Sequence, residues 1–433
     1  MKTLGLDIGT TTISAVVLDS DHGVLSSVTE ANDSFLAGAP YARMQNPARI
    51  LEIAQSTVHK LYQQHPDVAA VGVTGQMHGI LYLDAQGQPC SPLYTWQDGR
   101  GQELRPDGRT WVQWMSEVTG YPLATGFGMV THAYNIHHGL VPPDAAVFCT
   151  IPDYLAMVLS GRTAPAIDAS NAASLGVYNC REATFDTVAL QQAGIDVALL
   201  PVLATEPILG VGPMGIPVAV SLGDNQASFL GATNGATDAL LVNMGTGGQV
   251  SVYTPEYLET DALETRPFPD GGWLLVGASL AGGRSYALLE QFFRQVVTMV
   301  QGESGSVYDA MTRALDASDP VEHIPHVTTT FMGTRKDPTC RAAISGLGVD
   351  NFTPLHLIHG IMYGMAQELY TMYDSYLAVC DTSPKRMIGS GNGLQKNAHL
   401  CRVFEETFGC PLQLSTNPEE AASGAAFYAA RHC

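Results

Sequence analysis

The sequence predicts an α/β fold in two similar halves, and three observations support this prediction. Predicted strands alternate with predicted helices in each half, which is the pattern of a sheet covered by helices. A strand, a Gly-Thr turn and a second strand occur in residues 6–16 and again in residues 242–252. In the same order, residues 71–76 and 387–392 each contain a short apolar run that reaches a glycine.

A single junction near residues 231–238 accounts for both repeats. We therefore expect a first domain over residues 1–232 and a second domain over residues 233–433. The length of 433 residues agrees with this division, because domains usually contain about 100–150 residues and rarely exceed about 250.

Local signals predict the long helices in chain order. Asn46 is a predicted N-cap before a helix over residues 47–64, which begins with proline. Thr353 has the same role before a helix over residues 354–379, whose apolar residues recur at helical spacing. A last helix over residues 419–430 is rich in alanine and glycine, which suits close packing on a sheet.

Composition excludes two broad classes of function. The chain has 21 Lys and Arg against 41 Asp and Glu, a net charge of −20, which disfavours nucleic-acid binding. No apolar run approaches the roughly 20 residues that span a bilayer. The eight cysteines are scattered without a CxxC pair, so we interpret them as thiols in a reducing compartment. We expect a cytoplasmic protein with no membrane or nucleic-acid partner.

Two common nucleotide-binding motifs do not account for the glycines. A P-loop needs lysine after glycine, and no lysine of this chain follows a glycine. A GxGxxG pattern occurs at residues 210–215, but it precedes a predicted strand and contains Pro213. A dinucleotide fingerprint would instead follow a strand and open a helix.

The two Gly-Thr turns are better candidates for phosphate binding. Such a turn presents backbone N–H groups and hydroxyls to an anion, and a facing pair can hold a polyphosphate from both sides. Asp7, just before the first turn, is placed to hold Mg²⁺ against those phosphates, directly or through water. One turn alone would favour a plain hairpin with Asp7 as a turn residue, but the repeated pair favours phosphate.

Asp224 follows a predicted strand over residues 216–221 and begins an apparent helix. A carboxylate at the end of a strand, beside Gly223, is well placed as a general base toward a hydroxyl. The local sequence fits an ordinary helix N-cap equally well.

A polar cluster lies in residues 74–100, where GQMHG is followed by TWQDGR. An indole face together with amide, imidazole, carboxylate and guanidinium groups is the mixture that recognises a polyhydroxylated ligand. Two simpler alternatives remain open: His78 as a hydrogen-bonded core histidine, and Arg100 as the ion-pair partner of Asp98. His356 and His359 lack metal-ligand companions, and we interpret them as residues on a helix face.

With these segments in place, the chain resembles the FGGY carbohydrate kinases, a branch of the actin-like ATPase superfamily, over almost its whole length. LDIGTTTISAVVLD and NMGTGGQVSV are similar to the two phosphate loops of the family, and SLGDNQASFLGA to its catalytic aspartate region. GSGNGLQKN is similar to its adenosine loop. GQMHG and TWQDGR resemble the sedoheptulokinase branch most closely and xylulokinase-like enzymes next.

The resemblance implies two ribonuclease-H-like domains with a catalytic cleft between them, and it implies roles for residues at matching positions. Asp224 would be the catalytic base, and Asp7 would act in catalysis by positioning Mg²⁺. The sugar would be bound by residues of the polar cluster and by the neighbour of the base, namely Gln76, Met77, His78, Trp96, Asp98 and Asn225. ATP would be bound by residues of four glycine-containing segments, namely Gly9, Thr10, Thr11, Thr12, Gly245, Thr246, Gly247, Gly282, Gly283, Gly391, Asn392 and Asn397.

Two departures from the family pattern concern the adenosine loop and the first long helix. Ser390 stands where a glycine is frequent, and Met44-Gln45-Asn46-Pro47 stands where many relatives have Glu-Gln-Asp-Pro.

The implied reaction transfers the γ-phosphoryl group of ATP to the terminal hydroxyl of a ketose, sedoheptulose first and xylulose or ribulose second. The alternative from another class is a nucleotide-driven switch of the actin or chaperone kind. A homodimer is compatible with the sequence, which does not fix the oligomeric state.

Overall fold

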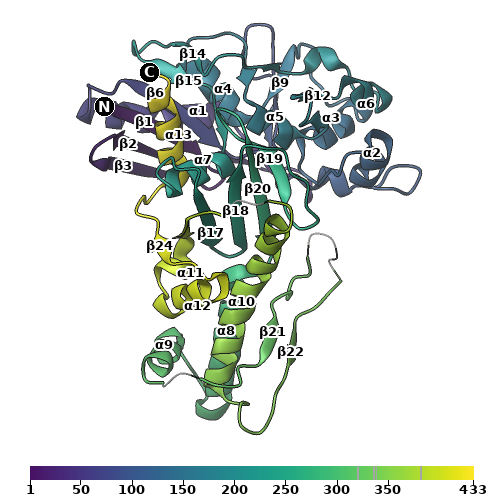
Figure 1. Cartoon of the computed structure of the whole chain (residues 1–433). Helices are drawn as coiled ribbons and strands as arrows, with labels where there is room; N and C mark the ends of the chain where they lie inside the picture. Colours follow the sequence, from purple (N-terminus) through teal and green to yellow (C-terminus); the bar gives the residue numbers. More distant parts are fainter. Residues whose placement is uncertain (319–320, 335–336, 338, 381–382) are drawn as a thin grey trace. The chain divides into compact units, whose positions relative to one another are not determined.

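The computed structural model describes residues 1–318, 321–334, 337, 339–380 and 383–433 (Figure 1). The chain folds into two compact units. Unit 1 comprises Met1–Ala236, Arg266–Gly272 and Asn417–Cys433, and unit 2 comprises Thr237–Thr265 and Trp273–Thr416. The expected boundary near residue 232 lies close to the first crossing, but the C-terminal segment belongs to unit 1. Its helix packs on the sheet of unit 1, which a division of the sequence into two continuous halves does not anticipate.

The central sheet of unit 1 has the strand order β14-β15-β6-β1-β2-β3, with β16 also paired to β6. Its strands are β1 (Lys2–Ile8), β2 (Thr12–Asp19), β3 (Gly23–Ala31), β6 (Ala70–Gly75), β14 (Ile208–Val211), β15 (Pro217–Ala219) and β16 (Leu222–Gly223). β1 pairs antiparallel with β2 and parallel with β6, and β6 pairs parallel with β16. The carboxyl ends of β1, β6 and β16 therefore meet at one edge of the sheet.

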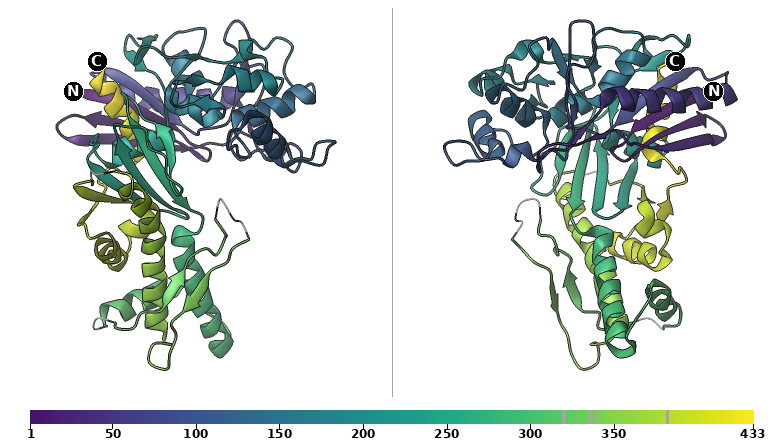
Figure 2. Two further views of the ribbon diagram at one scale, coloured as in Figure 1. Left: turned by 45° about the vertical axis from the view of Figure 1, so that its right-hand side comes forward. Right: turned by 180° about the vertical axis from the view of Figure 1, so that it is seen from behind.

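Two helices cover opposite faces of this sheet, α1 (Pro47–Gln64) and α13 (Glu420–Arg431) (Figure 2). Leu4 and Leu6 of β1 join the apolar core that contains α1. The residue between them, Gly5, faces α13, where a Cβ atom would lie 1.8 Å from the carbonyl oxygen of Ala422. The alternation of side chains along β1 thus sends Asp7, like Gly5, toward the α13 face.

The remainder of unit 1 is largely helical, and most of it packs around an apolar core of its own. Its helices and turns are η1 (Gly99–Gln102), α2 (Trp111–Thr119), α3 (Gly128–His137), α4 (Ile151–Leu159), α5 (Ala169–Leu175), α6 (Thr187–Gln192), η2 (Val197–Leu199) and α7 (Asp224–Ala232). Its short strands are β4 (Phe35–Leu36), β5 (Met44–Gln45), β7 (Leu81–Leu83), β8 (Leu93–Tyr94), β9 (Val147–Cys149), β10 (Ala166–Ile167), β11 (Tyr178–Asn179), β12 (Thr184–Phe185) and β13 (Val202–Leu203).

The sheet of unit 2 repeats the plan of unit 1, with the order β19-β20-β18-β17-β23-β24. Its strands are β17 (Ala239–Met244), β18 (Gly248–Thr254), β20 (Trp273–Ser279), β23 (Arg386–Ser390) and β24 (Leu412–Leu414). β17 pairs antiparallel with β18 and parallel with β23, as β1 does with β2 and β6. Both predicted repeats are therefore confirmed as equivalent parts of two similar sheets.

Helices accompany the sheet of unit 2, and α8 and α10 lie side by side (Figure 1). They are α8 (Gly282–Gln301), α9 (Tyr308–Asp316), α10 (Pro354–Leu377), α11 (Gly391–Gln395) and α12 (Ala398–Phe408). The short strands β21 (His326–Thr328) and β22 (Ala343–Ser345) form a ribbon beside α10, and the chain passes into unit 1 within β19 (Glu264–Pro267). In the part of the chain that the structure describes, no helix has the length and apolar character needed to cross a bilayer.

The predicted helix boundaries are largely confirmed, and one predicted strand is not. Asn46 caps α1 through its side chain, which accepts hydrogen bonds from the backbone of Ala48 and Arg49. The strand expected over residues 216–221 is shorter, as β15, and the separate strand β16 follows it; each pairs with β6 at a different place. Residues 210–215 lie in the β14–β15 hairpin, where they open no helix.

Candidate active site

Two carboxylates meet at the edge of the unit 1 sheet where parallel strands end. Asp7 of β1 lies opposite Thr74 of β6, and Thr74 lies opposite Leu222 of β16. Asp224 follows β16 directly and is the first residue of α7. Residues far apart in the sequence are thus brought together by strand pairing alone.

The electrostatics of this edge oppose the ionisation of both carboxyl groups. Burial, together with the carboxylates of Asp224 and Glu419, raises the pKa of Asp7 to about 7. Burial raises the pKa of Asp224 to about 6, against the opposing effects of Arg266 and the Asn225 backbone. A pKa near 6 suits a base that must be ionised at neutral pH yet accept a proton.

The same pair of carboxylates fits a cation that keeps most of its water ligands. Mg²⁺ is typically bound by one or two carboxylates together with water and substrate phosphates. Among the described residues, no group of three or more His, Cys, Asp or Glu side chains is arranged to hold a metal. Asp7 is the carboxylate of β1 that could hold Mg²⁺ together with water and phosphate.

The Asp224 side chain does not cap its own helix. The N-cap of α7 is Gly223, and Asp224 occupies the first helical position, so the N-cap alternative for Asp224 is wrong. The predicted sugar-binding residue Met77 packs against Gly223, where a Cβ atom would lie 2.7 Å from the Met77 methyl carbon. Asn225 follows in the first turn, and its Oδ1 atom is buried without a partner among the described residues. The structure thus brings Met77 and Asn225 beside the proposed base.

The first Gly-Thr turn is tied to the polar cluster through Thr10. The Trp96 indole N–H donates to the Thr10 hydroxyl at 3.0 Å. Gln45 donates to the Thr10 carbonyl oxygen at 2.9 Å and accepts from Gln76, also at 2.9 Å. Three of these four residues, Thr10, Trp96 and Gln76, were predicted as functional from the sequence, but Gln45 was missed. Its only signal was its place immediately before the Asn46-Pro47 helix start, where the chain departs from the family pattern.

Asn32 is a second residue that sequence reasoning missed. Its side chain donates to the carbonyl oxygen of Gly9 at 2.9 Å, and its backbone N–H donates to the carbonyl oxygen of Thr11. The side chains of Thr11 and Thr12 are exposed at the turn. Asn32 therefore holds the backbone of the turn at Gly9 and Thr11, Gln45 holds it at Thr10, and the side chains of Thr11 and Thr12 stay exposed.

His78 is held in a conformation that few residues other than glycine adopt. Its φ is 71°, a region that costs free energy and is often found at functional sites. Its backbone N–H donates to the Ser174 hydroxyl, and its Nδ1 atom lies 2.7 Å from the Ser174 carbonyl oxygen. The ring stacks on Phe127 with centroids 4.5 Å apart. His78 is partly exposed with a fixed ring, as a ligand-binding residue requires.

Asp98 lies deeper than the proposed sugar-binding role suggests. Its side chain is fully buried and forms an ion pair with Arg100, with Nε and Oδ1 2.7 Å apart. Its other oxygen accepts the backbone N–H of Arg43 at 3.0 Å. The ion-pair alternative for Arg100 is therefore confirmed. Asp98 is placed to hold the segment that carries Trp96, whose own side chain is 45% exposed.

In unit 2, the second Gly-Thr turn packs against the beginning of α8. The N–H groups of Gly283 and Arg284 donate to the carbonyl oxygens of Gly245 and Thr246, each at 3.0 Å. A Cβ atom on Gly282 would lie only 2.2 Å from the carbonyl carbon of Gly247. These contacts bring together two predicted nucleotide-binding segments that are well separated in the sequence.

The predicted adenosine loop lies next to the same turn. Gly391 has a φ of 81°, and a Cβ atom there would lie 2.7 Å from the carbonyl carbon of Met244. Asn397 caps α12 through its side chain, which accepts the backbone N–H of Leu400. Asn392 is exposed. All the unit 2 residues predicted to bind the nucleotide thus belong to one group around the carboxyl ends of β17 and β23.

Comparison with known proteins gives the same picture for both units. The N-terminal domain model of the FGGY family of carbohydrate kinases matches residues 2–231, and the C-terminal domain model matches residues 240–433. The chain is 30% identical to a sedoheptulokinase from Mus musculus, over 98% of this chain and 96% of that protein. It is 29% identical to the one from Homo sapiens, over 99% and 98% of the two chains.

Solved structures agree at the level of the fold. A xylulose kinase from Rhodospirillum rubrum superimposes with a TM-score of 0.83 at 22% identity, covering 99% of this chain and 89% of that one. A glycerol kinase from Plasmodium falciparum, solved with ADP, gives a TM-score of 0.81 at 16% identity, covering 100% and 89%. The two units are thus actin-like domains, and the chain belongs to the FGGY family of carbohydrate kinases as an ATP-dependent sugar kinase.

Proposed function

We propose that this kinase phosphorylates the terminal hydroxyl of sedoheptulose, with Asp224 as the general base. The observation that carries the assignment of the base is its position at the end of β16, beside Met77 and close to Asp7. The similarity to two mammalian sedoheptulokinases over nearly the whole chain supports the choice of sugar.

The proposed chemistry is an in-line transfer in which the protein positions and neutralises the reacting groups. The sugar hydroxyl attacks the γ-phosphorus of ATP, its proton passes to the Asp224 carboxylate, and ADP leaves. Because the phosphoryl transition state is loose, most of the acceleration should come from positioning and charge neutralisation. The raised pKa of Asp224 makes its carboxylate a stronger proton acceptor than an exposed aspartate.

We propose that the phosphate loop of each unit contacts the same nucleotide. Thr10, Thr11 and Thr12 would contribute from unit 1, and the turn from Gly245 to Gly247 would contribute from unit 2. Gly282, Gly283, Gly391, Asn392 and Asn397 would bind the adenosine. Asp7 would hold Mg²⁺, directly or through water, and the ion would supply positive charge to the phosphates. A chain with a net charge of −20 has few lysines and arginines to spare for that purpose.

The sugar pocket would be formed by Gln76, Met77, His78, Trp96 and Asn225. Trp96 offers an exposed indole face for the apolar side of a sugar, and the fixed His78 ring offers polar edge groups. Asp98 would act one step behind the pocket, through the Trp96 segment.

The experiment that tests this proposal is a panel of ketoses with five to seven carbons. Each would be incubated with Mg-ATP and the chain, and ADP formation and phosphorylated product would be measured. The proposal expects the highest kcat/KM with sedoheptulose and lower values with xylulose and ribulose. A higher value with either pentulose would reassign the chain to a pentulose kinase. ATP hydrolysis that no sugar stimulates would instead support a nucleotide switch.

A homodimer and a cytoplasmic location stay predictions. Light scattering of the purified chain would give its mass in solution and decide between a monomer and the homodimer. Fractionation of cells that express the chain would test its location, and recovery with membranes would contradict the prediction.

A further inference from the structure

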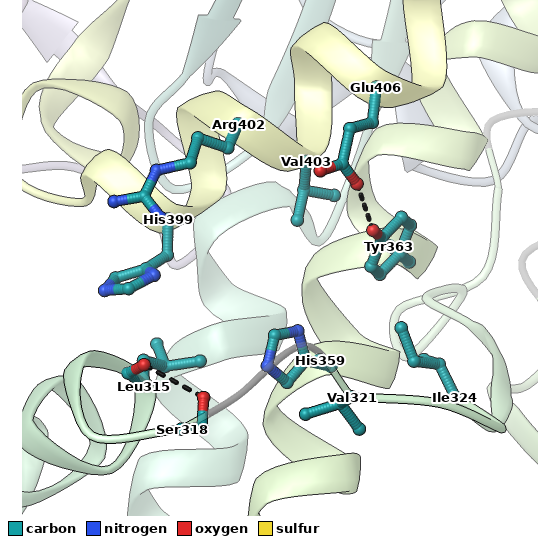
Figure 3. Close-up of a pocket in the computed structure, with 10 residues that line it drawn as sticks. All are labelled: Leu315, Ser318, Val321, Ile324, His359, Tyr363, His399, Arg402, Val403 and Glu406. Carbon is teal, nitrogen blue, oxygen red and sulfur yellow. Dashed lines mark hydrogen bonds between the residues drawn. The ribbon is translucent and has the colours of Figure 1, made fainter.

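Unit 2 contains a cavity that the sugar kinase reaction does not use. It has a volume of about 500 Å³ and is lined by residues of α10 and α12, by Leu315 and Ser318 at the end of α9, and by Val321 and Ile324 (Figure 3). This volume is within the range of about 300–1,000 Å³ that small-molecule sites occupy. Its lining contains none of the residues proposed above for ATP or the sugar.

Three nitrogen-bearing side chains face this cavity. Figure 3 shows the ring of His359 projecting into it from α10, and His399 and Arg402 of α12 lying together on another side. His399 is oriented by Asp316, whose carboxylate oxygen lies 2.8 Å from its Nε2 atom. Arg402 forms no ion pair with any residue that the structure describes.

His359 has the clearest unmet requirement for a partner. Its Nε2 atom is buried and has no hydrogen-bond partner in the described part of the chain. A buried polar atom without a partner costs roughly 1–3 kcal/mol, so a ligand that reaches this atom after a small rotation of the ring would recover that loss. Burial lowers the pKa of His359, neighbouring His399 and His356 lower it as well, and Glu406 raises it.

The carboxylate on the opposite wall is already engaged. Glu406 accepts a hydrogen bond from the hydroxyl of Tyr363. Glu406 retains oxygen lone pairs that can accept from a ligand hydroxyl, and Val321, Ile324 and Val403 give the cavity an apolar wall. The cavity therefore combines a cationic side, an acceptor side and an apolar wall within the size of one small metabolite.

We propose that this cavity binds a small hydroxylated organic anion, with its phosphate or carboxylate group against His359, His399 and Arg402. Arginine and histidine are suited to such a group because their N–H donors match its oxygens. The ligand hydroxyls would donate to Glu406. This site is separate from the ATP and sugar residues, and its occupant is an effector, not a substrate.

The position of the cavity gives the effector a route to the nucleotide. Asn397, which we propose to contact adenosine, caps α12 through the backbone N–H of Leu400. His399 and Arg402 lie in the first two turns of the same helix. An anion that fixes these turns would change the affinity for ATP through Asn397. This last step rests on the proposed function, whereas binding to the cavity does not.

The test is a set of binding titrations on the full chain by calorimetry, with inorganic phosphate, citrate and ribose 5-phosphate as probes. Neutral ribose is the control ligand. At least one anion should bind with millimolar or tighter affinity, and ribose should not. Arg402→Gln and His359→Gln should each weaken that binding by about tenfold or more, since each removes a hydrogen bond to a charged group. Because Arg402 is exposed, its replacement should not disturb folding.

Three controls separate this site from other anion sites. Arg313→Gln removes an exposed arginine of α9 outside the cavity, and His326→Gln removes an exposed histidine of β21; both should leave binding unchanged. Thr246→Val alters the second phosphate loop. Binding that falls in Thr246→Val but persists in Arg402→Gln would place the anion at the nucleotide site and overturn the inference. Absence of binding by all three probes would also overturn it.

A further measurement distinguishes failure of this inference from failure of the proposed function. The titrations require no turnover, so they can be repeated on Asp224→Asn. An inactive chain that still binds the anion through Arg402 retains the cavity site, whatever its sugar. In the active enzyme, the bound anion should change the KM for ATP at least about twofold, and an unchanged KM would remove the effector role.

Discussion

The two Gly-Thr hairpins share a fold but differ in their chemistry. Each joins two antiparallel strands, and the first strand of each pairs parallel with a third. Asp7 lies two residues before Gly9, and Asn243 lies two residues before Gly245. The partly buried carboxylate of unit 1 is thus replaced in unit 2 by a neutral amide, which donates to the Ser390 hydroxyl at 2.6 Å.

The two turns also differ in the kind of group that holds them. Side chains of Gln45, Asn32 and Trp96 hold the first turn, and its neighbours include the second carboxylate, Asp224. The second turn is held mainly by backbone groups of Gly283 and Arg284. Unit 1 therefore has the charged groups that chemistry and metal binding need, and unit 2 has the close backbone surface that nucleotide binding needs. Changes in unit 1 should lower kcat, and changes in unit 2 should raise the KM for ATP.

The largest effect is expected from Asp224→Asn in unit 1. Loss of a general base typically costs about 10²–10⁴-fold in rate, so kcat should fall by that factor while sugar affinity stays near normal. In the unaltered enzyme, kcat should rise as pH rises through about 6, where Asp224 ionises. Steady-state kinetics across pH 5–9 and calorimetric sugar binding would measure these effects. A variant that retains full turnover would remove Asp224 as the base.

The same variant should be more stable at alkaline pH. The pKa of Asp224 is raised from 3.8 to about 6, so folding is favoured while the group is protonated, and that advantage is lost as pH rises through about 6. The asparagine variant has no such loss. Without ligands at pH 8, the free energy of unfolding of the variant should exceed that of the unaltered chain by on the order of 2–3 kcal/mol. Its Tm should be higher accordingly. The difference should disappear near pH 4, and thermal melts at the two pH values would measure it.

The next effect comes from exchanging the residues that distinguish the hairpins. Asp7→Asn gives unit 1 the residue of unit 2 and should lower kcat by about 10–100-fold, with a higher Mg²⁺ requirement. Asn243→Asp adds the carboxylate to unit 2. It should raise the KM for ATP through charge repulsion, and it should not restore Asp7→Asn when the two are combined. Mg²⁺ titrations of the three variants would test this, and recovery in the double variant would show that the hairpins are interchangeable.

A smaller effect, limited to nucleotide binding and stability, is expected from Gly282→Ala in unit 2. The new methyl group would meet the backbone of Gly247 at 2.2 Å, so the turn must shift. Such overpacking typically costs about 1–3 kcal/mol of stability. The KM for ATP should rise more than kcat falls. Gly305→Ala is the matched control, because a Cβ atom there meets nothing within 4 Å. Equal behaviour of the two variants in thermal melts and ATP kinetics would contradict the proposed contact.

Sequence reasoning succeeded where a local signal determines the structure and was incomplete where side chains meet over long distances. The Asn46-Pro47 and Thr353-Pro354 signals gave the starts of α1 and α10, because caps are encoded by adjacent residues. The return of α13 to unit 1 depends on surface complementarity at Gly5 and Ala422, which no local pattern reveals.

The candidate site shows the same division. Asp7 was identified because it lies just before a repeated Gly-Thr turn, and Asp224 because it follows a predicted strand. Gln45 was missed because its contacts to Thr10 and Gln76 involve residues that are 31 or more positions away. The depth of Asp98 was also not apparent, because a TWQDGR segment looks the same whether its aspartate faces a ligand or an arginine.

The smallest effect should come from Trp96→Phe, which tests whether the polar cluster positions the first turn. Phenylalanine keeps an aromatic face for the sugar but loses the N–H group that donates to Thr10. A neutral hydrogen bond contributes about 0.5–1.5 kcal/mol, so kcat should fall only a few-fold and the sugar KM should change little. Trp96→Ala removes the face as well and should raise the sugar KM further. If the two variants have the same sugar KM, the indole face does not bind the sugar. If Trp96→Phe keeps full kcat, the indole N–H does not position the turn, and the difference between the hairpins rests on the carboxylates alone.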